Sequence, residues 1–218
     1  ATGVLGYRPN ANLISDLRGE TDSQRGQQIL EQAFPPGELA PTTVLVQADD
    51  PRSAAEVVAN AIRDHYKPIG AEGPVASDDV SVCVALADRL DTLAGCFAVG
   101  LSPTGAADPF ALRRACIATL RTLVESAKRN PAYASLRLGD LFAWAYDGFA
   151  GKKLDLSKEQ TVAKLRDFAS ERLRGLIATQ TSNAVADAVC AGGDLDHPAH
   201  AMARARALHR AVTEGRAW

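Results

Sequence analysis

Hydrophobic residues between positions 80 and 98 recur at the spacing of an α-helix. Four of them follow one another at steps of four, three and four, which places them on one apolar stripe. These residues are Leu86, Leu90, Leu93 and Phe97. Asp88 and Asp91 fall on the opposite side, where residues three apart are neighbours. Ser77 or Asp78 is well placed to cap the start, so the pattern predicts a helix with one buried face.

A short connection with turn chemistry leads from this helix into a second one. Pro103 fixes its own φ and Gly105 can adopt the positive φ that other residues resist, with Thr104 between them. Asp108 followed by Pro109 is typical of a helix start, because it supplies a capping acceptor and then proline at the first helical position. The second helix is expected to turn four residues inward, namely Leu112, Cys116, Thr119 and Leu123.

Three arginines are expected on the outer face of this second helix. Arg114 and Arg121 are seven positions apart and therefore superimposed, and Arg113 lies to one side of them. Such a guanidinium cluster can hold phosphates through paired hydrogen bonds. Alternatively, it pairs with the acidic face of the preceding helix, since charged helix faces are commonly solvated or paired.

The rest of the second half is also helical in pattern. Asn130-Pro131 ends the second helix, and a further helix is expected over 136–149, with its aromatic residues in the core rather than forming a surface for base stacking. The side chains expected around this helix core are Leu141, Phe142, Trp144 and Ala145. A long helix is predicted from Ser157 to about 179. Gly192-Gly193 ends the next one, and Pro198 opens the last.

The first part of the chain has a different character. We expect a helix over 23–34, a short strand over 42–47 and a helix over 53–65. The last of these is expected to turn Ala55, Val58 and Ile62 inward. The fold class predicted from these patterns is mostly α, a helical bundle with a small α/β segment at the N-terminus.

Charge is unevenly divided along the 218 residues. Residues 1–112 contain seven Lys plus Arg and fifteen Asp plus Glu, a balance of −8, whereas residues 113–218 contain seventeen and eleven, a balance of +6. A basic second half is what an RNA-contacting surface needs, because neutralising phosphates dominates such affinity. A moderately basic helical surface without an RNA partner is also common.

No run of hydrophobic residues reaches the length of a membrane helix, and no signal peptide is evident. We therefore expect a cytoplasmic protein. The four cysteines are isolated from one another within apolar patterns, which predicts reduced core thiols. They are Cys83, Cys96, Cys116 and Cys190.

Several of these motifs together resemble the β subunit of bacterial two-subunit glycyl-tRNA synthetase. The run ALADRLDTLAGCFAVG, then PTG, then ADPFALRRACIATLR is similar to a segment of that family's helical domain, which is related to HD phosphohydrolases. His65, Tyr66 and Pro68 resemble the family's HYxP element. Weaker similarity extends through 168–174 and 185–189, so the resemblance covers about residues 57–212.

The resemblance implies a division of labour between two subunits. A separate α subunit uses ATP and Mg²⁺ to form glycyl-adenylate, while β binds and orients tRNA(Gly), so no cofactor is expected in this chain. The implied tRNA contacts are Arg113, Arg114, Arg121 and Lys67. The implied domains are an HD-like helical domain over 57–150 and a helical segment over 151–218 that leads toward an anticodon-binding region. The implied assembly is a hetero-oligomer, and this chain alone is not expected to be catalytic.

Two other functions stay open at this point. An HD-type metal phosphohydrolase would need a cluster of metal ligands, which His65 with Asp88 or Asp91 could partly supply, although no His-Asp dipeptide exists. Asp194, Asp196, His197 and His200 form a second possible cluster, but caps and surface positions explain them with fewer assumptions. The other alternative is a structural scaffold without RNA contact.

Residues 1–56 do not fit the synthetase pattern. The run SQRGQQILEQAFPPGELAPTTVLVQ instead resembles a soluble segment of exporters of the resistance-nodulation-division and MMPL type. Exporter function does not follow from that resemblance, because membrane spans are lacking. We therefore treat 1–56 as a small α/β segment of uncertain origin, which could be fused, divergent or artificially joined.

Overall fold

The computed structural model of the protein describes residues 49–70, 72–105 and 107–215. The elements in chain order are α2 (Pro51–Asp64), α3 (Asp79–Ala98), α4 (Leu112–Ser126), the 3₁₀-helix η1 (Pro131–Ser135), α5 (Leu138–Asp147), α6 (Lys158–Gln180), α7 (Asn183–Gly192) and α8 (Pro198–Thr213). In the described part of the chain, extended pairing is limited to one bridge between Thr104 and Ala107. The mostly α fold class is confirmed. The helix predicted over 23–34 and the strand over 42–47 lie outside the described residues.

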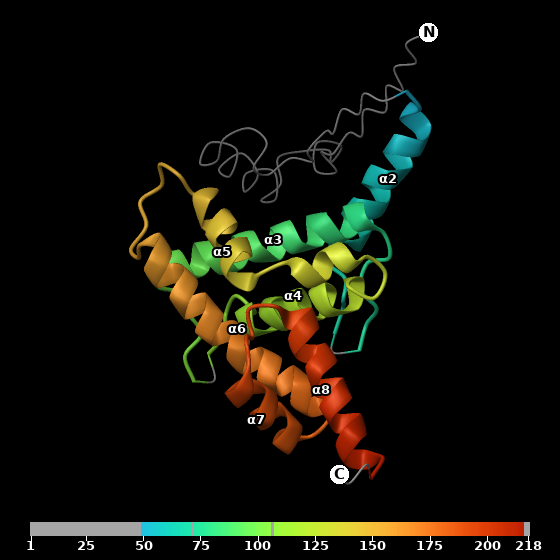
Figure 1. Ribbon diagram of the computed structural model, residues 1–218. Coiled ribbons are helices and arrows are strands. Elements are labelled where there is room, and N and C mark those ends of the chain that lie inside the picture. Colours follow the sequence, from blue (N-terminus) through green and yellow to red (C-terminus); the bar gives the residue numbers. More distant parts are fainter. Residues whose placement is uncertain (1–48, 71, 106, 216–218) are drawn as a thin grey trace, which may run out of the picture. The chain divides into compact units, whose positions relative to one another are not determined.

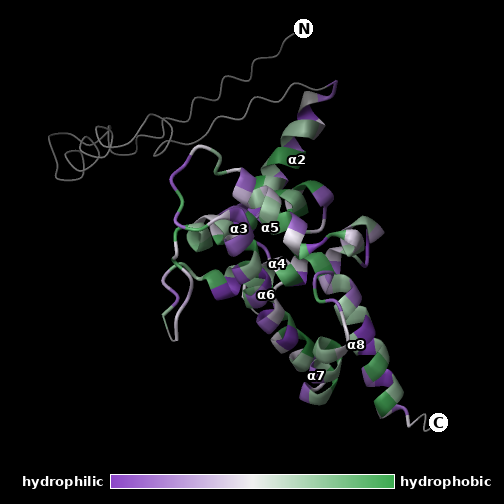
Figure 2. Cartoon of the chain, turned by 60° about the vertical axis from the view of Figure 1, so that its left-hand side comes forward, coloured by the Kyte–Doolittle hydropathy of each residue, from purple (hydrophilic) through white to green (hydrophobic). Residues whose placement is uncertain are grey.

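Residues from 52 onward form one compact unit built around α3. This helix packs against α4, α5 and α6, while α7 and α8 close the other side of α6 (Figure 1). Figure 2 shows hydrophilic and hydrophobic positions alternating along α6 and α8, as expected of helices with one face in the core. The predicted division of this unit near residue 150 stays a prediction.

The α3 helix follows the prediction closely. The stripe of Leu86, Leu90, Leu93 and Phe97 is buried, while Asp88 and Asp91 are exposed. Asp78 is the N-cap, and its carboxylate accepts a hydrogen bond from the Ser81 amide at 2.8 Å. Gly95 allows the ring of Phe149 to approach, because a Cβ there would lie 2.8 Å from the Phe149 Cζ atom.

The long α6 helix and the C-terminal helices also begin and end where the sequence indicates. Ser157 and Gln160 form a reciprocal capping box at the start of α6. Gly193 follows the last residue of α7, and Pro198 is the first residue of α8. Among the described residues, no helix is both long enough and apolar enough to cross a membrane.

Several expectations about individual residues are wrong. The α4 helix starts at Leu112 rather than at Pro109, because Ala111 takes a left-handed conformation with φ 55°. Ala55 and Ile62 on α2 are exposed. Cys83 is exposed on α3 and is therefore not a core thiol.

Trp144 is a further correction, because its side chain is 65% exposed. The core face of α5 is narrow and consists of Leu138, Leu141 and Phe142, which leaves position 144 outside it. The expectation that this aromatic residue belongs to the core is wrong.

Candidate nucleic-acid interface

The outer side of α4 presents Arg113, Arg114, Ile117 and Arg121, which we call the α4 face. Arg114 and Ile117 are exposed, whereas Arg113 and Arg121 are half-buried. Arg114 forms no hydrogen bond or ion pair with another described residue. Neither Arg113 nor Arg114 pairs with Asp88 or Asp91 within the described part of the chain. The acidic side of α3 therefore does not neutralise these two arginines.

The two half-buried arginines hold the loops on either side of the α4 face. Arg113 donates to the carbonyl oxygen of Gly105. Arg121 donates to the carbonyl oxygens of Gly70 and Gly73, at 3.4 and 2.8 Å. A carbonyl oxygen accepts a hydrogen bond without carrying a formal charge, so these contacts orient the guanidinium groups and leave their positive charge in place.

The loop over 101–111 is shaped by its own backbone and by one carboxylate. Thr104 and Ala107 exchange backbone hydrogen bonds around Gly105, which has φ 52°. Asp108 accepts hydrogen bonds from the amides of Leu112 and Arg113 at 2.7 and 3.0 Å. Asp108 thus satisfies the first amides of α4 as predicted, although the helix begins later. Pro103 is half-buried, while Thr104 and Pro109 are exposed.

The connector over 65–78 lies on the other side of the α4 face. The rings of His65 and Tyr66 contact each other with centroids 3.9 Å apart. Lys67 Nζ lies 3.0 Å from a carboxylate oxygen of Asp64, which also pairs with Arg63. These two cations hold the pKa of the Asp64 carboxyl below its usual value. Pro68 is buried.

The buried Arg89 anchors the start of this connector. Its guanidinium donates to the carbonyl oxygens of Ala85 and Lys67, and burial lowers its pKa. Arg89 and Arg121 together tie the backbone of 67–73 to α3 and α4. The structure therefore brings two of the predicted RNA contacts, Lys67 and Arg121, to the same short connector.

The predicted metal ligands are not brought together. His65 bonds the carbonyl oxygen of Ile62, while Asp88 and Asp91 lie exposed on α3. Within the described ranges, no group of three or more His, Cys, Asp or Glu side chains could hold a metal ion.

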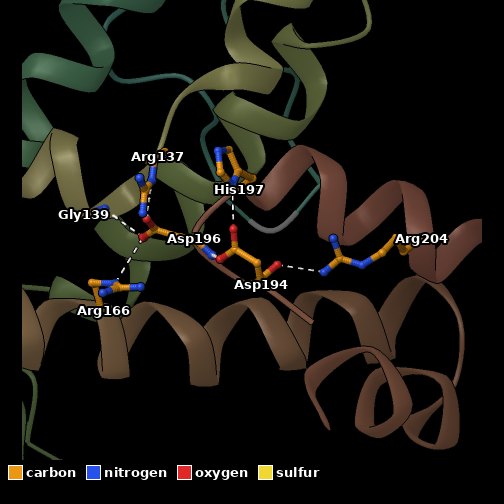
Figure 3. Close-up of polar contacts among 7 residues, drawn as sticks. All are labelled: Arg137, Gly139, Arg166, Asp194, Asp196, His197 and Arg204. Atoms are coloured by element: carbon orange, nitrogen blue, oxygen red, sulfur yellow. Dashed lines mark hydrogen bonds and ion pairs between the residues drawn. The ribbon is translucent and has the colours of Figure 1, made fainter. Parts of the chain in front are cut away.

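The most connected carboxylate of the described chain is one that the sequence pattern presented only as a cap. Asp196 is 4% exposed and accepts hydrogen bonds from Arg137 Nε at 3.0 Å and the Gly139 amide at 2.9 Å, and it pairs with Arg166 at 3.2 Å (Figure 3). Its carbonyl oxygen accepts from the Leu138 amide. We call this arrangement the Asp196 clamp; it joins α5, α6 and the loop before α8.

Asp194 organises the loop that carries the clamp. Its carboxylate accepts from the Asp196 amide at 2.7 Å and contacts His197 Nδ1 at 2.8 Å, which holds the pKa of Asp194 below its usual value (Figure 3). Arg204 donates to the Asp194 carbonyl oxygen. His197 and His200 stack at 5.4 Å. The contacts of Asp194 and Asp196 join elements of the fold, and the four predicted residues do not form a metal centre.

Comparison with known proteins agrees with the motifs of α3 and α4. Residues 50–191 match the family described as glycyl-tRNA synthetase beta subunit. Curated proteins named glycine–tRNA ligase beta subunit are 39% identical over 155 residues in Nitratidesulfovibrio vulgaris and 36% identical over 181 residues in Geotalea uraniireducens. These alignments cover 71% and 83% of this chain.

The same alignments cover only 21% and 23% of the relatives' own length. A third relative, from Oleidesulfovibrio alaskensis, is 38% identical over 57% of this chain and 17% of its own. The chain thus spans about a fifth of the length of the curated relatives it matches. Because the family match extends over more than half of the chain, from α2 through α7, this chain belongs to the glycyl-tRNA synthetase beta subunit family.

Proposed function

We infer that this chain is a tRNA-facing part of a glycyl-tRNA synthetase β subunit. It binds and orients tRNA(Gly), while a separate α subunit supplies the ATP- and Mg²⁺-dependent formation of glycyl-adenylate. In this proposal the chain works in the cytoplasm as part of a hetero-oligomer. Its contribution to rate is positioning, since holding the 3′ end near an activated carbonyl makes the transfer effectively intramolecular.

One observation supports the proposal beyond family membership: no described carboxylate pairs with Arg113 or Arg114 on the α4 face. Arg114 is exposed without a described partner, and Arg113 is bound to a carbonyl rather than a carboxylate. Guanidinium groups that are held in place but not neutralised are suited to phosphates, which they can contact through paired hydrogen bonds.

The test is binding of the purified chain to tRNA(Gly), followed by fluorescence anisotropy across a salt series. We expect affinity to fall steeply with salt, because each phosphate contact releases counterions. Arg114→Ala should lower the slope of log K against log salt concentration by about one, and replacing Arg113, Arg114 and Arg121 together should lower it further. Lys153→Ala is the matched control, because it removes one exposed cation from the loop after α5.

Two results would contradict the proposal. The first is a slope in the triple variant equal to that of the wild-type chain, with both folded by circular dichroism. The second is no binding at low salt. Either one would favour a structural module, in which Arg113 and Arg121 serve only to hold their loops.

A further inference from the structure

Tyr66 is a large aromatic side chain that the fold leaves outside the core. It is 67% exposed, although it lies between the buried residues Asp64 and Pro68. An exposed ring at such a position has no packing role on its outward face. Its hydroxyl forms no hydrogen bond with another described residue.

One face of the Tyr66 ring is supported. The His65 ring lies against it with centroids 3.9 Å apart and an angle of 39° between the planes. His65 is itself fixed to the end of α2 by its Nδ1 contact with the Ile62 carbonyl oxygen. A ring supported on one face and exposed on the other needs little ordering to accept a planar ligand.

The backbone that follows Tyr66 is also held in place. Arg89 binds the Lys67 carbonyl oxygen, and Arg121 binds those of Gly70 and Gly73. Tyr66 is four residues from Gly70, so the Cα atoms of these two residues lie within about 15 Å of each other. Lys67 and Arg63 add two cations around a single carboxylate, Asp64.

An exposed aromatic ring near guanidinium groups is the arrangement that proteins use for unpaired nucleotides. Bases stack on the ring, and the cations follow the phosphates. We propose that Tyr66 stacks on an unpaired base of the bound RNA, next to the phosphate contacts of the α4 face. This inference rests on the proposed function and names the kind of nucleotide bound, a single-stranded one.

The chain supplies a matched control for this proposal. Trp144 is almost equally exposed at 65%, and tryptophan is also a good stacking surface. However, the exposed carboxylate of Asp140 lies one turn away on α5 and would repel a phosphate backbone. If aromatic exposure alone were sufficient, both rings would bind RNA.

The experiment compares two RNA hairpins with the same acceptor-stem duplex, one blunt and one with four unpaired 3′ nucleotides. We expect wild-type protein to prefer the overhang. Tyr66→Ala should weaken overhang binding roughly 5-fold to 100-fold and leave blunt binding unchanged. Tyr66→Phe should keep the preference, because it retains the ring, and Trp144→Ala should have no effect.

The salt series separates this inference from the proposed function. Tyr66→Ala should leave the salt slope unchanged, since stacking neutralises no phosphate. An overhang preference that persists in Tyr66→Ala would overturn the stacking role alone, with the arginine-dependent slope intact. An equal loss on both hairpins would also overturn it. If wild-type protein binds neither RNA, both ideas fail together.

Discussion

The molecule has two groups of arginines with opposite surroundings. Around the Asp196 clamp, Arg137 and Arg166 both pair with the carboxylate of Asp196, which is buried. On the α4 face, Arg113 and Arg121 contact backbone carbonyl oxygens, and Arg114 is exposed. The first group shares one carboxylate partner, whereas no described carboxylate pairs with Arg113 or Arg114.

This difference separates arginines that hold the fold from arginines that are available to a ligand. A carboxylate partner weakens the positive field of a guanidinium group in solvent. A carbonyl partner carries no formal charge, so it orients the guanidinium group and leaves most of its positive field in place. Counting arginines on a helix does not distinguish the two cases. The chemical nature of the hydrogen-bond acceptor distinguishes them. Each group of arginines can be tested by its own variants.

The largest expected effect is on the clamp. Asp196→Ala removes the acceptor of three donors, from Arg137, Gly139 and Arg166, and leaves the amide of Gly139 without its partner. We expect the free energy of unfolding to fall by about 2 to 4 kcal/mol, since the carboxylate is buried but its arginines are half exposed. Urea denaturation followed by circular dichroism measures this loss.

The control for this variant is Asp187→Ala. Asp187 pairs with Arg174 through an exposed carboxylate, so its removal should cost about 0.5 kcal/mol or less. A loss in Asp196→Ala no larger than in the control would show that the clamp does not hold the helices. At temperatures where Asp196→Ala is folded, its salt slope for tRNA should equal that of the wild-type chain.

A smaller effect is expected at acid pH from Asp194. Its hydrogen bonds from the Asp196 amide and His197 lower its pKa in the folded chain. Its contribution is therefore complete above the unfolded pKa of about 3.9 and is lost as the pH falls through the lower folded value. The difference in urea midpoint between wild type and Asp194→Asn should shrink between pH 5 and pH 3. A constant difference would contradict this assignment.

The parts of the fold that depend on local pattern could be predicted from the sequence. The stripe from Leu86 to Phe97 has the helical period, and Asp78 and Ser157 cap helices through neighbours three residues away. The superposition of Arg114 and Arg121 on one side of a helix is likewise a matter of spacing. These features need no knowledge of the tertiary structure.

Features that depend on distant partners could not be predicted. Asp196 reads as a helix cap before Pro198, because its partner Arg137 is 59 residues away. The bond between Arg121 and Gly73 spans 48 residues, so this acceptor leaves no local signal in the sequence. Trp144 fits an apolar run, and only the narrow packing of α5 leaves it exposed.

The smallest expected effect tests whether the RNA phosphates pass close to the connector over 65–78. Glu72 is an exposed carboxylate beside Gly73, whose carbonyl oxygen binds Arg121. Glu72→Gln should tighten tRNA binding by about twofold to threefold at low salt, because it removes a carboxylate that repels the RNA phosphates. This repulsion acts over roughly 10 Å at 0.1 M salt. Anisotropy at two salt concentrations should show the gain shrinking as salt rises.

Asp91→Asn provides the comparison for Glu72→Gln. It removes the same charge from the exposed side of α3, where no described arginine pairs with it. If both variants tighten binding equally, the affinity depends only on the net charge of the protein, and the RNA has no preferred path across its surface. If only Glu72→Gln does so, the phosphates pass along the connector between Tyr66 and Arg121. The carbonyl-bound arginine would then guide the backbone beside the ring that stacks the base.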